Sequence, residues 1–242
     1  MPLSNMDLEN LEKDYFDQIF DAITHDQQRM TDALMSKDKI KVDWLSKFQY
    51  GTKQRETSDL ARGAERVFFF LINKGWFPNS APIGADLFFE SHNAFIHIDI
   101  KTARENNYAD FKGISPTSNN QTSYKPTASY RGTTIRTQPN LPHYYSNGKT
   151  CLTYTIQIIY DHTTYAIIAI LLICIPNGQL FAVYGNNIVT AGKSKDESFR
   201  YKYARNPCFD LLPERPLRVK FIYFNNSYGL AKKDITEKNS IT

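Results

Sequence analysis

An uninterrupted apolar run from Tyr165 to Ile175 constrains the fold of this chain more than any other feature. Turn-forming residues bound the run, and it is about half as long as a membrane-spanning helix has to be. A strand without an alternating polar side has to be buried on both faces. We therefore expect an α/β protein with a mixed central β-sheet and helices or another layer on each side.

Other elements of this sheet and its flanks are predicted from hydrophobic periodicity. Strands are expected where apolar residues alternate or follow a turn, at Cys151 to Tyr160, Leu180 to Tyr184 and Leu217 to Phe224. Helices are expected where apolar residues recur every three or four positions, at residues 5–24, 27–48 and 58–74. Thr57 or Ser58 would cap the last helix, and Gly75 would end it.

The chain is long enough for one large domain with a helical appendage. Apolar residues make up 41% of the 242 residues and aromatic residues 14%, which is ample for a packed core. We expect an N-terminal helical region at 1–50, a main domain at 51–228 and a polar, frayed tail at 229–242.

Acidic and basic residues gather on a predicted hairpin. Its strands are Pro82 to Glu90 and Ala94 to Thr102, on either side of a short polar turn. Because side chains alternate along a strand, Asp99 and Lys101 share one face. Asp86 stands thirteen positions before Asp99, a spacing that lets two antiparallel strands bring both carboxylates together.

Two carboxylates and an ammonium group at one point suit metal-assisted hydrolysis of a phosphodiester. A carboxylate at the end of a core strand is costly to bury unless it is paired or binds a metal. The alternative is that Asp99 and Lys101 form a solvated ion pair on an edge strand.

Asp86 and the tripeptide Asp99-Ile100-Lys101 resemble the PD-(D/E)xK motif of type II restriction endonucleases and related nucleases. The resemblance covers residues 82–102, and Ala85 stands where the motif has its proline. It implies the restriction-endonuclease-like fold, with a mixed sheet between helices and the chain acting as a homodimer on double-stranded DNA. A structure-specific repair nuclease with the same core and a non-catalytic DNA-binding protein are the alternatives.

The same resemblance implies a role for each residue of the motif. Asp86, Asp99 and the Ile100 carbonyl would bind Mg²⁺, with Mn²⁺ able to substitute, and Lys101 would help to activate water or stabilise the transition state. Glu65, at the flank of the buried stripe of helix 58–74, would be a further catalytic acid or metal ligand. A surface ion pair or plain solvation is the other interpretation of Glu65.

Residues 102–150 are poor in aliphatic side chains and rich in polar ones, which is typical of a long functional loop or a small irregular subdomain. Asn, Gln and Arg read base edges, whereas Ser, Thr and Lys suit phosphates. A merely solvated loop has a similar composition. The candidate DNA-binding residues are Asn119, Asn120, Gln121, Lys125, Tyr130, Arg131, Arg136 and Gln138.

A second basic stretch interleaved with aromatic residues occupies 193–205 and also suits a phosphate backbone, although a solvated loop is equally compatible with it. The net charge of +4 is compatible with an anionic partner. Three widely separated cysteines without a CxxC pair predict a reducing, cytoplasmic setting, and no signal peptide or membrane segment is visible.

Overall fold

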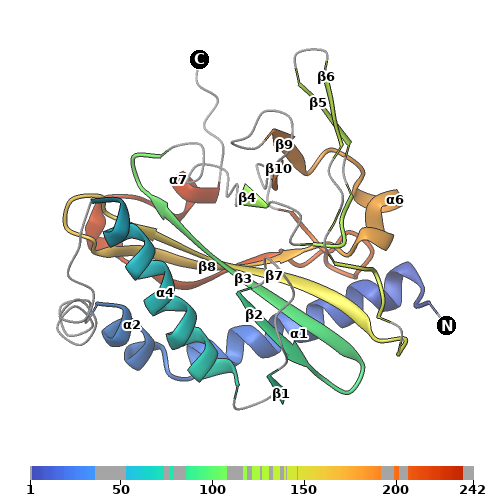
Figure 1. The fold of residues 1–242 in the computed structure, drawn as a ribbon, viewed down its shortest axis with the longest axis horizontal. Coiled ribbons are helices and arrows are strands. Elements are labelled where there is room, and N and C mark those ends of the chain that lie inside the picture. Colours follow the sequence, from blue (N-terminus) through green and yellow to red (C-terminus); the bar gives the residue numbers. More distant parts are fainter. Residues whose placement is uncertain are drawn as a thin grey trace.

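A six-stranded mixed sheet, seen in the computed structural model, forms the centre of the molecule in the order β1-β2-β3-β7-β8-β11 (Figure 1). The strands are β1 (Phe77–Pro78), β2 (Leu87–Glu90), β3 (Ala94–Arg104), β7 (Thr150–Tyr160), β8 (Ile167–Ile175) and β11 (Val219–Phe224). The structure describes residues 2–35, 53–73, 77–78, 86–107, 117–118, 122–125, 127–130, 133–136, 139, 141–145, 147–191, 199–201 and 207–236.

The sheet is mixed because one pair of neighbours is parallel. β3 and β7 run parallel from Ala94 beside Thr150 to Arg104 beside Tyr160, whereas the other described neighbours in this sheet are antiparallel. All nine residues of β8 are buried, as the continuous apolar run predicts. The predicted α/β fold with a mixed central sheet is therefore confirmed.

Three helices, α1 (Asn5–Thr24), α2 (Gln27–Met35) and α4 (Lys53–Ile72), lie on one side of the sheet (Figure 1). The Ser4 hydroxyl caps α1 by accepting a hydrogen bond from the Asp7 amide at 3.2 Å. α4 begins several residues before the predicted cap, and α2 ends at Met35, beyond which the predicted helix 27–48 lies outside the described residues.

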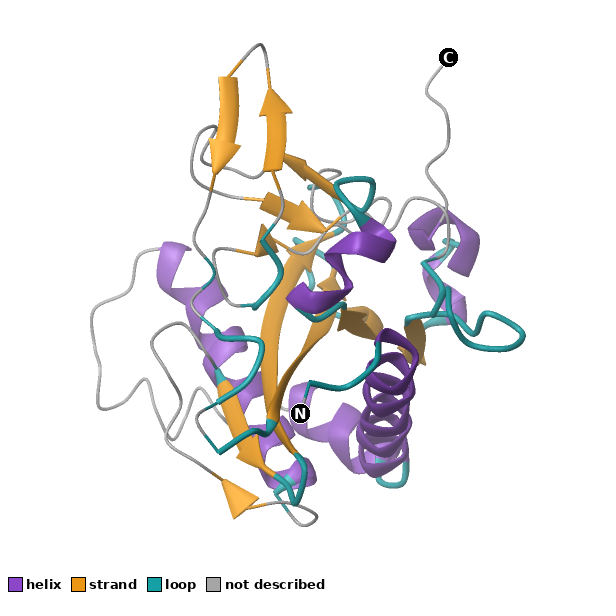
Figure 2. Cartoon of the chain, turned by 90° about the vertical axis from the view of Figure 1, so that its right-hand side faces the viewer, coloured by secondary structure: helices purple, strands orange, loops and turns teal. Residues whose placement is uncertain are grey.

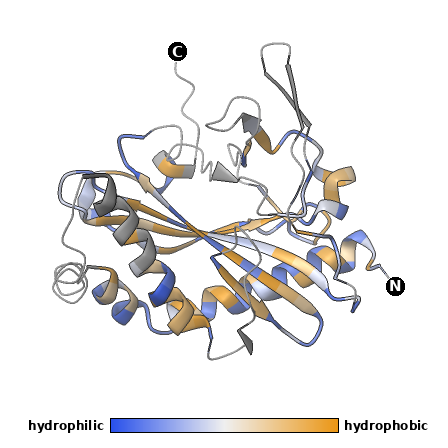
Figure 3. Cartoon of the chain, in the orientation of Figure 1, coloured by the Kyte–Doolittle hydropathy of each residue, from blue (hydrophilic) through white to orange (hydrophobic). Residues whose placement is uncertain are grey.

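Apolar side chains join these helices to the sheet. Phe16 of α1 stacks on Tyr154 of β7, and Phe69 of α4 stacks on Phe89 of β2. Colouring by hydropathy shows apolar residues concentrated on the central strands and on the helix faces turned toward them (Figure 3). α1 is thus part of the main hydrophobic core, which its amphipathic pattern alone does not reveal.

Smaller elements lie on the opposite side of the sheet. β4 (Thr117–Ser118), β10 (Phe199–Tyr201) and β9 (Val189–Ala191) form a three-stranded sheet, and β5 (Thr127–Tyr130) pairs with β6 (Thr133–Arg136). The β5–β6 hairpin projects beyond the rest of the molecule (Figure 2). The 3₁₀ turn η1 (Gly178–Leu180) leads directly into α6 (Phe181–Tyr184) beside them.

Two predictions about the second half of the chain were wrong. Leu180 to Tyr184 is helical and not a strand, because the Asn177 side chain accepts a hydrogen bond from the Gln179 amide and starts η1. The C-terminal segment is not simply frayed, since η2 (Asn226–Tyr228) is followed by α7 (Lys232–Thr236), whose Ile235 is fully buried. Among the described residues, no helix is long and apolar enough to cross a membrane.

Candidate active site

The β2–β3 hairpin brings the predicted acidic and basic residues together. Asp86 stands just before β2, and its Oδ2 accepts a hydrogen bond from the Ile100 amide of β3 at 2.6 Å. Asp99 Oδ1 accepts a hydrogen bond from Lys101 Nζ at 2.7 Å. The Asp86 carboxyl group lies close enough to Asp99 to raise the pKa of the Asp99 carboxyl group. The predicted convergence of these three side chains is therefore present.

Asp99 is buried on a central strand, which rules out the alternative of a solvated pair on an edge strand. Its exposed fraction is 4%, and β3 lies between β2 and β7. Lys101, by contrast, keeps 27% of its side chain exposed. The pair thus lies at the boundary between the core and the surface.

Burial controls the protonation of Asp99. Desolvation raises the pKa of its carboxyl group from 3.8 to about 7, the attraction of Lys101 opposes this rise, and the nearby Asp86 carboxylate adds to it. A carboxyl group that titrates near neutrality because of burial and a like charge is typical of functional sites. The positive charge of Lys101 does not fully compensate the two carboxylates.

The site faces away from the helices. In the register of β3 and β7, Asp99 lies beside Thr155 and Lys101 beside Gln157, whereas Ile98 lies beside Tyr154. Tyr154 points to α1, where its hydroxyl donates to the Glu12 carbonyl at 2.9 Å. Alternation along the strands then puts Asp99, Lys101 and Gln157 on the opposite face, on the side of the smaller β elements.

Glu65 lies half-buried on α4, which packs on the face of the sheet opposite to Asp99 and Lys101. Within the described ranges, no three His, Cys, Asp or Glu side chains are grouped so that they could hold a metal ion. The structure therefore brings together Asp86, Asp99 and Lys101, and does not add Glu65 to them as a third acidic ligand.

The two polar stretches considered for DNA binding are joined to each other. Thr117 of β4 pairs with Arg200 of β10, so the segment 102–150 and the segment 193–205 share one small sheet. Lys125 is exposed, Tyr130 ends β5 and Arg136 ends β6. The other candidate DNA-binding residues lie outside the described part of the chain: Asn119, Asn120, Gln121, Arg131 and Gln138.

A buried charged cluster was missed by the sequence analysis. Arg218 has no exposed surface and lies 3.2 Å from Glu9 Oε1 and 2.7 Å from Glu12 Oε2. A signal was present, because Glu12 stands four residues from both Leu8 and Phe16, in the middle of the apolar stripe of α1. A carboxylate in that position needs a buried partner.

The comparisons with known proteins place the chain in a family of restriction enzymes. The family model of the N-terminal domain of the type II restriction enzyme MwoI matches residues 5–164, and that of its central domain matches residues 167–224. The two matches meet in the turn between β7 and β8, so both contribute strands to one sheet. No curated protein matches the sequence.

Two solved structures share the fold. The restriction endonuclease BglI bound to its DNA recognition sequence has a TM-score of 0.64 and 15% identity, over 88% of this chain and 90% of that one. Tetrameric SfiI bound to cognate DNA has a TM-score of 0.64 and 14% identity, over 93% of this chain and 87% of that one.

The sequence left three kinds of protein open: a restriction endonuclease, a repair nuclease and a non-catalytic DNA-binding protein. The family match selects the restriction endonuclease. The first match alone covers more than half of the chain. The chain therefore belongs to the MwoI family of type II restriction enzymes and is a type II restriction endonuclease, a site-specific deoxyribonuclease.

Proposed function

We propose that this enzyme hydrolyses phosphodiester bonds of double-stranded DNA with Asp86, Asp99 and Lys101 as catalytic residues and Mg²⁺ as the metal. The observation that carries the proposal is the buried Asp99 of a central strand, which pairs with the Lys101 ammonium group and has its pKa raised by the nearby Asp86 carboxyl group. Mn²⁺ has the same preference for oxygen ligands, so we expect it to substitute.

The donor atoms fit a hard divalent cation. Two neighbouring carboxylates repel each other, and a cation bound by both removes that repulsion. On a strand, the N–H and C=O of one residue point to the same neighbour, so the Ile100 carbonyl faces the side on which its amide meets Asp86. Asp86, Asp99 and the Ile100 carbonyl are the proposed ligands.

Hydrolysis joins a water oxygen to phosphorus and breaks the bond to the leaving sugar oxygen, which takes up a proton. The bound cation would supply positive charge for the phosphoryl oxygens and acidify water. Lys101 extends from the buried pair toward solvent and donates hydrogen bonds. We assign it to orienting the attacking water and to offsetting the negative charge that develops in the transition state. For Glu65 we propose only an indirect role, as an acid that influences Asp86, Asp99 and Lys101 without binding the metal.

The small β elements opposite the helices are the proposed DNA-binding unit. A two-stranded β-ribbon fits the major groove, and β5–β6 projects from the molecule in this form. The exposed Lys125 and the basic stretch around β10 would contact phosphates. The residues proposed to read bases are Tyr130, Arg136 and the five candidates outside the described part of the chain: Asn119, Asn120, Gln121, Arg131 and Gln138.

We also propose a homodimer that acts in the cytoplasm. Cutting both strands of a symmetric duplex site calls for two active sites related by a two-fold axis. BglI and SfiI are both described in complex with DNA, and SfiI as a tetramer, so assembly beyond a monomer is compatible with this fold. None of the three cysteines is in a disulfide, which fits a reducing compartment.

Digestion of a long unmethylated DNA tests this function. Discrete fragments are expected with Mg²⁺ and none with EDTA, and Lys101→Ala should lower the cleavage rate by roughly a hundredfold or more. Lys149→Ala is the matched control, because Lys149 has a similarly exposed side chain and pairs at 2.5 Å with Glu90 of the same hairpin. This variant should keep the cleavage pattern and rate of the parent.

Two results would contradict the proposal. A smear without discrete fragments would show that cleavage is not sequence-specific. Equal loss of activity in Lys101→Ala and Lys149→Ala would mean that any change in the hairpin inactivates the enzyme, and Lys101 would lose its assigned role.

A further inference from the structure

A buried polar tripeptide lies inside the otherwise polar segment 102–150. Thr122, Ser123 and Tyr124 are 3%, 1% and 2% exposed, although Lys125 directly after them is exposed. A surface loop does not bury three consecutive polar residues unless they have partners in the core. This tripeptide is therefore an attachment point between the proposed DNA-binding unit and the rest of the fold.

The partner of the tripeptide is residues 177–185, which we call the platform. At its start, the Gly178 amide donates to Ser123 Oγ at 2.9 Å. The approach is so close that a Cβ atom on Gly178 would overlap the Ser123 carbonyl oxygen. At its end, Tyr124 Oη donates to the Gly185 carbonyl at 2.5 Å. The tripeptide thus contacts the platform near both of its ends.

Aromatic packing links the same tripeptide to the second basic stretch. The Tyr124 ring packs against Phe181 of α6 and, edge-on, against Tyr201 of β10, with ring centroids 5.7 and 6.1 Å away. Tyr201 directly follows Arg200, as Lys125 directly follows Tyr124. Two buried tyrosines in contact therefore fix the backbone positions of two basic residues in the proposed DNA-binding unit.

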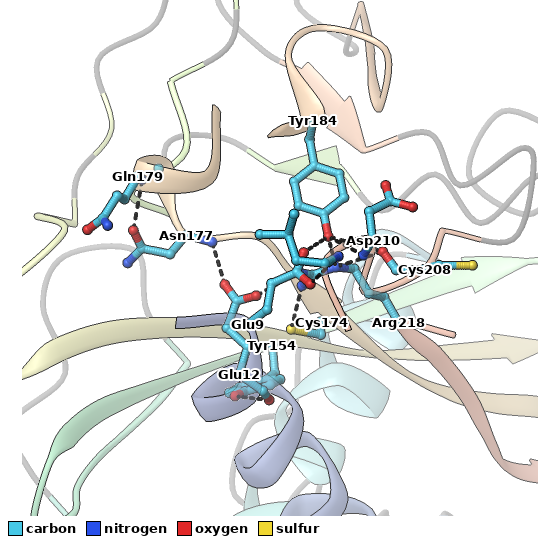
Figure 4. Close-up of polar contacts among 12 residues, drawn as sticks. Glu9, Glu12, Tyr154, Cys174, Asn177, Gln179, Tyr184, Cys208, Asp210 and Arg218 are labelled. Atoms are coloured by element: carbon cyan, nitrogen blue, oxygen red, sulfur yellow. Dashed lines mark hydrogen bonds and ion pairs between the residues drawn. The ribbon is translucent and has the colours of Figure 1, made fainter. Parts of the chain in front are cut away.

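The platform is in turn bound to the helix layer by buried charges (Figure 4). Before its first turn, the Asn177 amide donates to Glu12 Oε1 at 2.7 Å. On α6, Tyr184 Oη accepts from Arg218 Nε at 3.0 Å and donates to Glu9. Because Arg218 pairs with both glutamates of α1, the platform is held at two points by one deeply buried cluster.

We propose that Tyr124 and Ser123 are positioning residues that set the sequence discrimination of the enzyme, by fixing the DNA-binding unit on the platform. A fixed unit leaves its polar groups unpaired against a wrong base, whereas a movable unit finds alternative partners. Loosening the attachment therefore lowers the cost of a mismatch more than it lowers the rate of chemistry. The inference rests on the proposed sequence-specific cleavage.

Tyr124→Phe is the most selective test, since it keeps the ring and removes only the hydrogen bond to Gly185. Wild type and variant are incubated with a phage-length DNA in Mg²⁺, and the cut ends are mapped by sequencing. We expect the ratio of cleavage at the preferred site to cleavage at sites with one mismatch to fall about tenfold, the equivalent of one lost net hydrogen bond. The single-turnover rate at the preferred site should stay within about threefold.

Tyr15→Phe is the matched control. Tyr15 is similarly buried and donates to Asn93 Oδ1 at 2.5 Å, at the turn of the β2–β3 hairpin. A general loss of stability lowers cleavage at all sites alike and leaves the discrimination ratio unchanged. This variant should therefore lose thermal stability without changing the ratio.

Ser123→Ala removes the acceptor of the Gly178 amide. Its discrimination ratio is measured as a second test, which is needed if Tyr124→Phe does not fold. A lowered ratio in either variant, with the Tyr15→Phe ratio unchanged, supports the inference. If the ratio is unchanged in each of the two variants that folds, the inference is overturned, while the proposed function stands. Failure of the wild type to give discrete fragments is a different result, because it contradicts the proposed function itself.

Discussion

At the scale of single residues, the candidate active site follows from strand alternation, whereas the buried arginine does not. Asp99 and Lys101 share a face because they are two positions apart on a strand, and their apolar neighbours require that strand to be central. Arg218 stands alone in a strand-like pattern, and its partners Glu9 and Glu12 are about two hundred residues away in sequence. No local pattern connects residues so far apart.

The pKa of Asp99 predicts a pH dependence for the metal-free protein. Its folded-state value of about 7 lies above the ordinary 3.8, so the folded state holds the proton more tightly. The proton on Asp99 therefore stabilises the folded state fully below about pH 4, and this stabilisation is lost as the pH rises through 7. Because the amide introduced by Asp99→Asn cannot ionise, this variant should gain stability relative to wild type over this range, by on the order of 4 kcal/mol at most.

Urea unfolding of both proteins in EDTA, from about pH 4 to pH 8, measures this difference. Carboxyl groups that do not interact with Asp99 titrate alike in the two proteins and cancel in the comparison. A difference in unfolding free energy that does not change with pH would contradict the assigned protonation of Asp99.

At the scale of secondary-structure elements, periodicity predicted α1, the central strands and the β2–β3 hairpin, and it failed where a short capping signal decided the structure. The apolar run from Leu180 to Tyr184 resembles a strand, but the Asn177 cap turns it into η1 and α6. The burial of Ser123 and Tyr124 could not be predicted either. It depends on Gly178 and Gly185, which are brought to them only by the tertiary fold.

Arg218 joins α1, α6 and the start of β11, so its removal should destabilise the fold strongly. In Arg218→Met, the carboxyl groups of Glu9 and Glu12 stay buried without their cation, which typically costs about 3–5 kcal/mol. Arg215→Met is the control, because Arg215 lies in the same loop, is exposed and pairs with Asp210 at the surface. Chemical denaturation that shows equal stability for the two variants would contradict the role of the cluster.

At the scale of the whole molecule, one continuous fold links the helix layer, the proposed catalytic hairpin and the proposed DNA-binding unit. The hairpin presents its acidic residues on the face of the sheet opposite the helices, on the side where the small β elements are found. The buried cluster around Arg218 connects α1 to the platform on which those elements rest. The proposed catalytic residues and the proposed DNA-binding unit are thus separate parts of the chain held by one core.

The proposed homodimer predicts a mass in solution of twice the 27.9 kDa chain. A second subunit would give the assembly the two active sites needed to cut both strands in one encounter. Sedimentation equilibrium, with and without a DNA duplex, measures this mass. A monomer under both conditions would contradict the dimer, and a mass of four chains would indicate a higher assembly.

The measurement that tests the central claim most directly is the single-turnover cleavage rate at the mapped site for wild type, Asp86→Asn and Asp99→Asn. With Mg²⁺, each variant should cleave about a thousandfold or more slowly, because each loses a charged ligand of the proposed metal site. Both should still bind the same duplex with Ca²⁺ in place of Mg²⁺. Cleavage by folded Asp86→Asn or Asp99→Asn within about tenfold of the wild-type rate would show that the active site lies elsewhere.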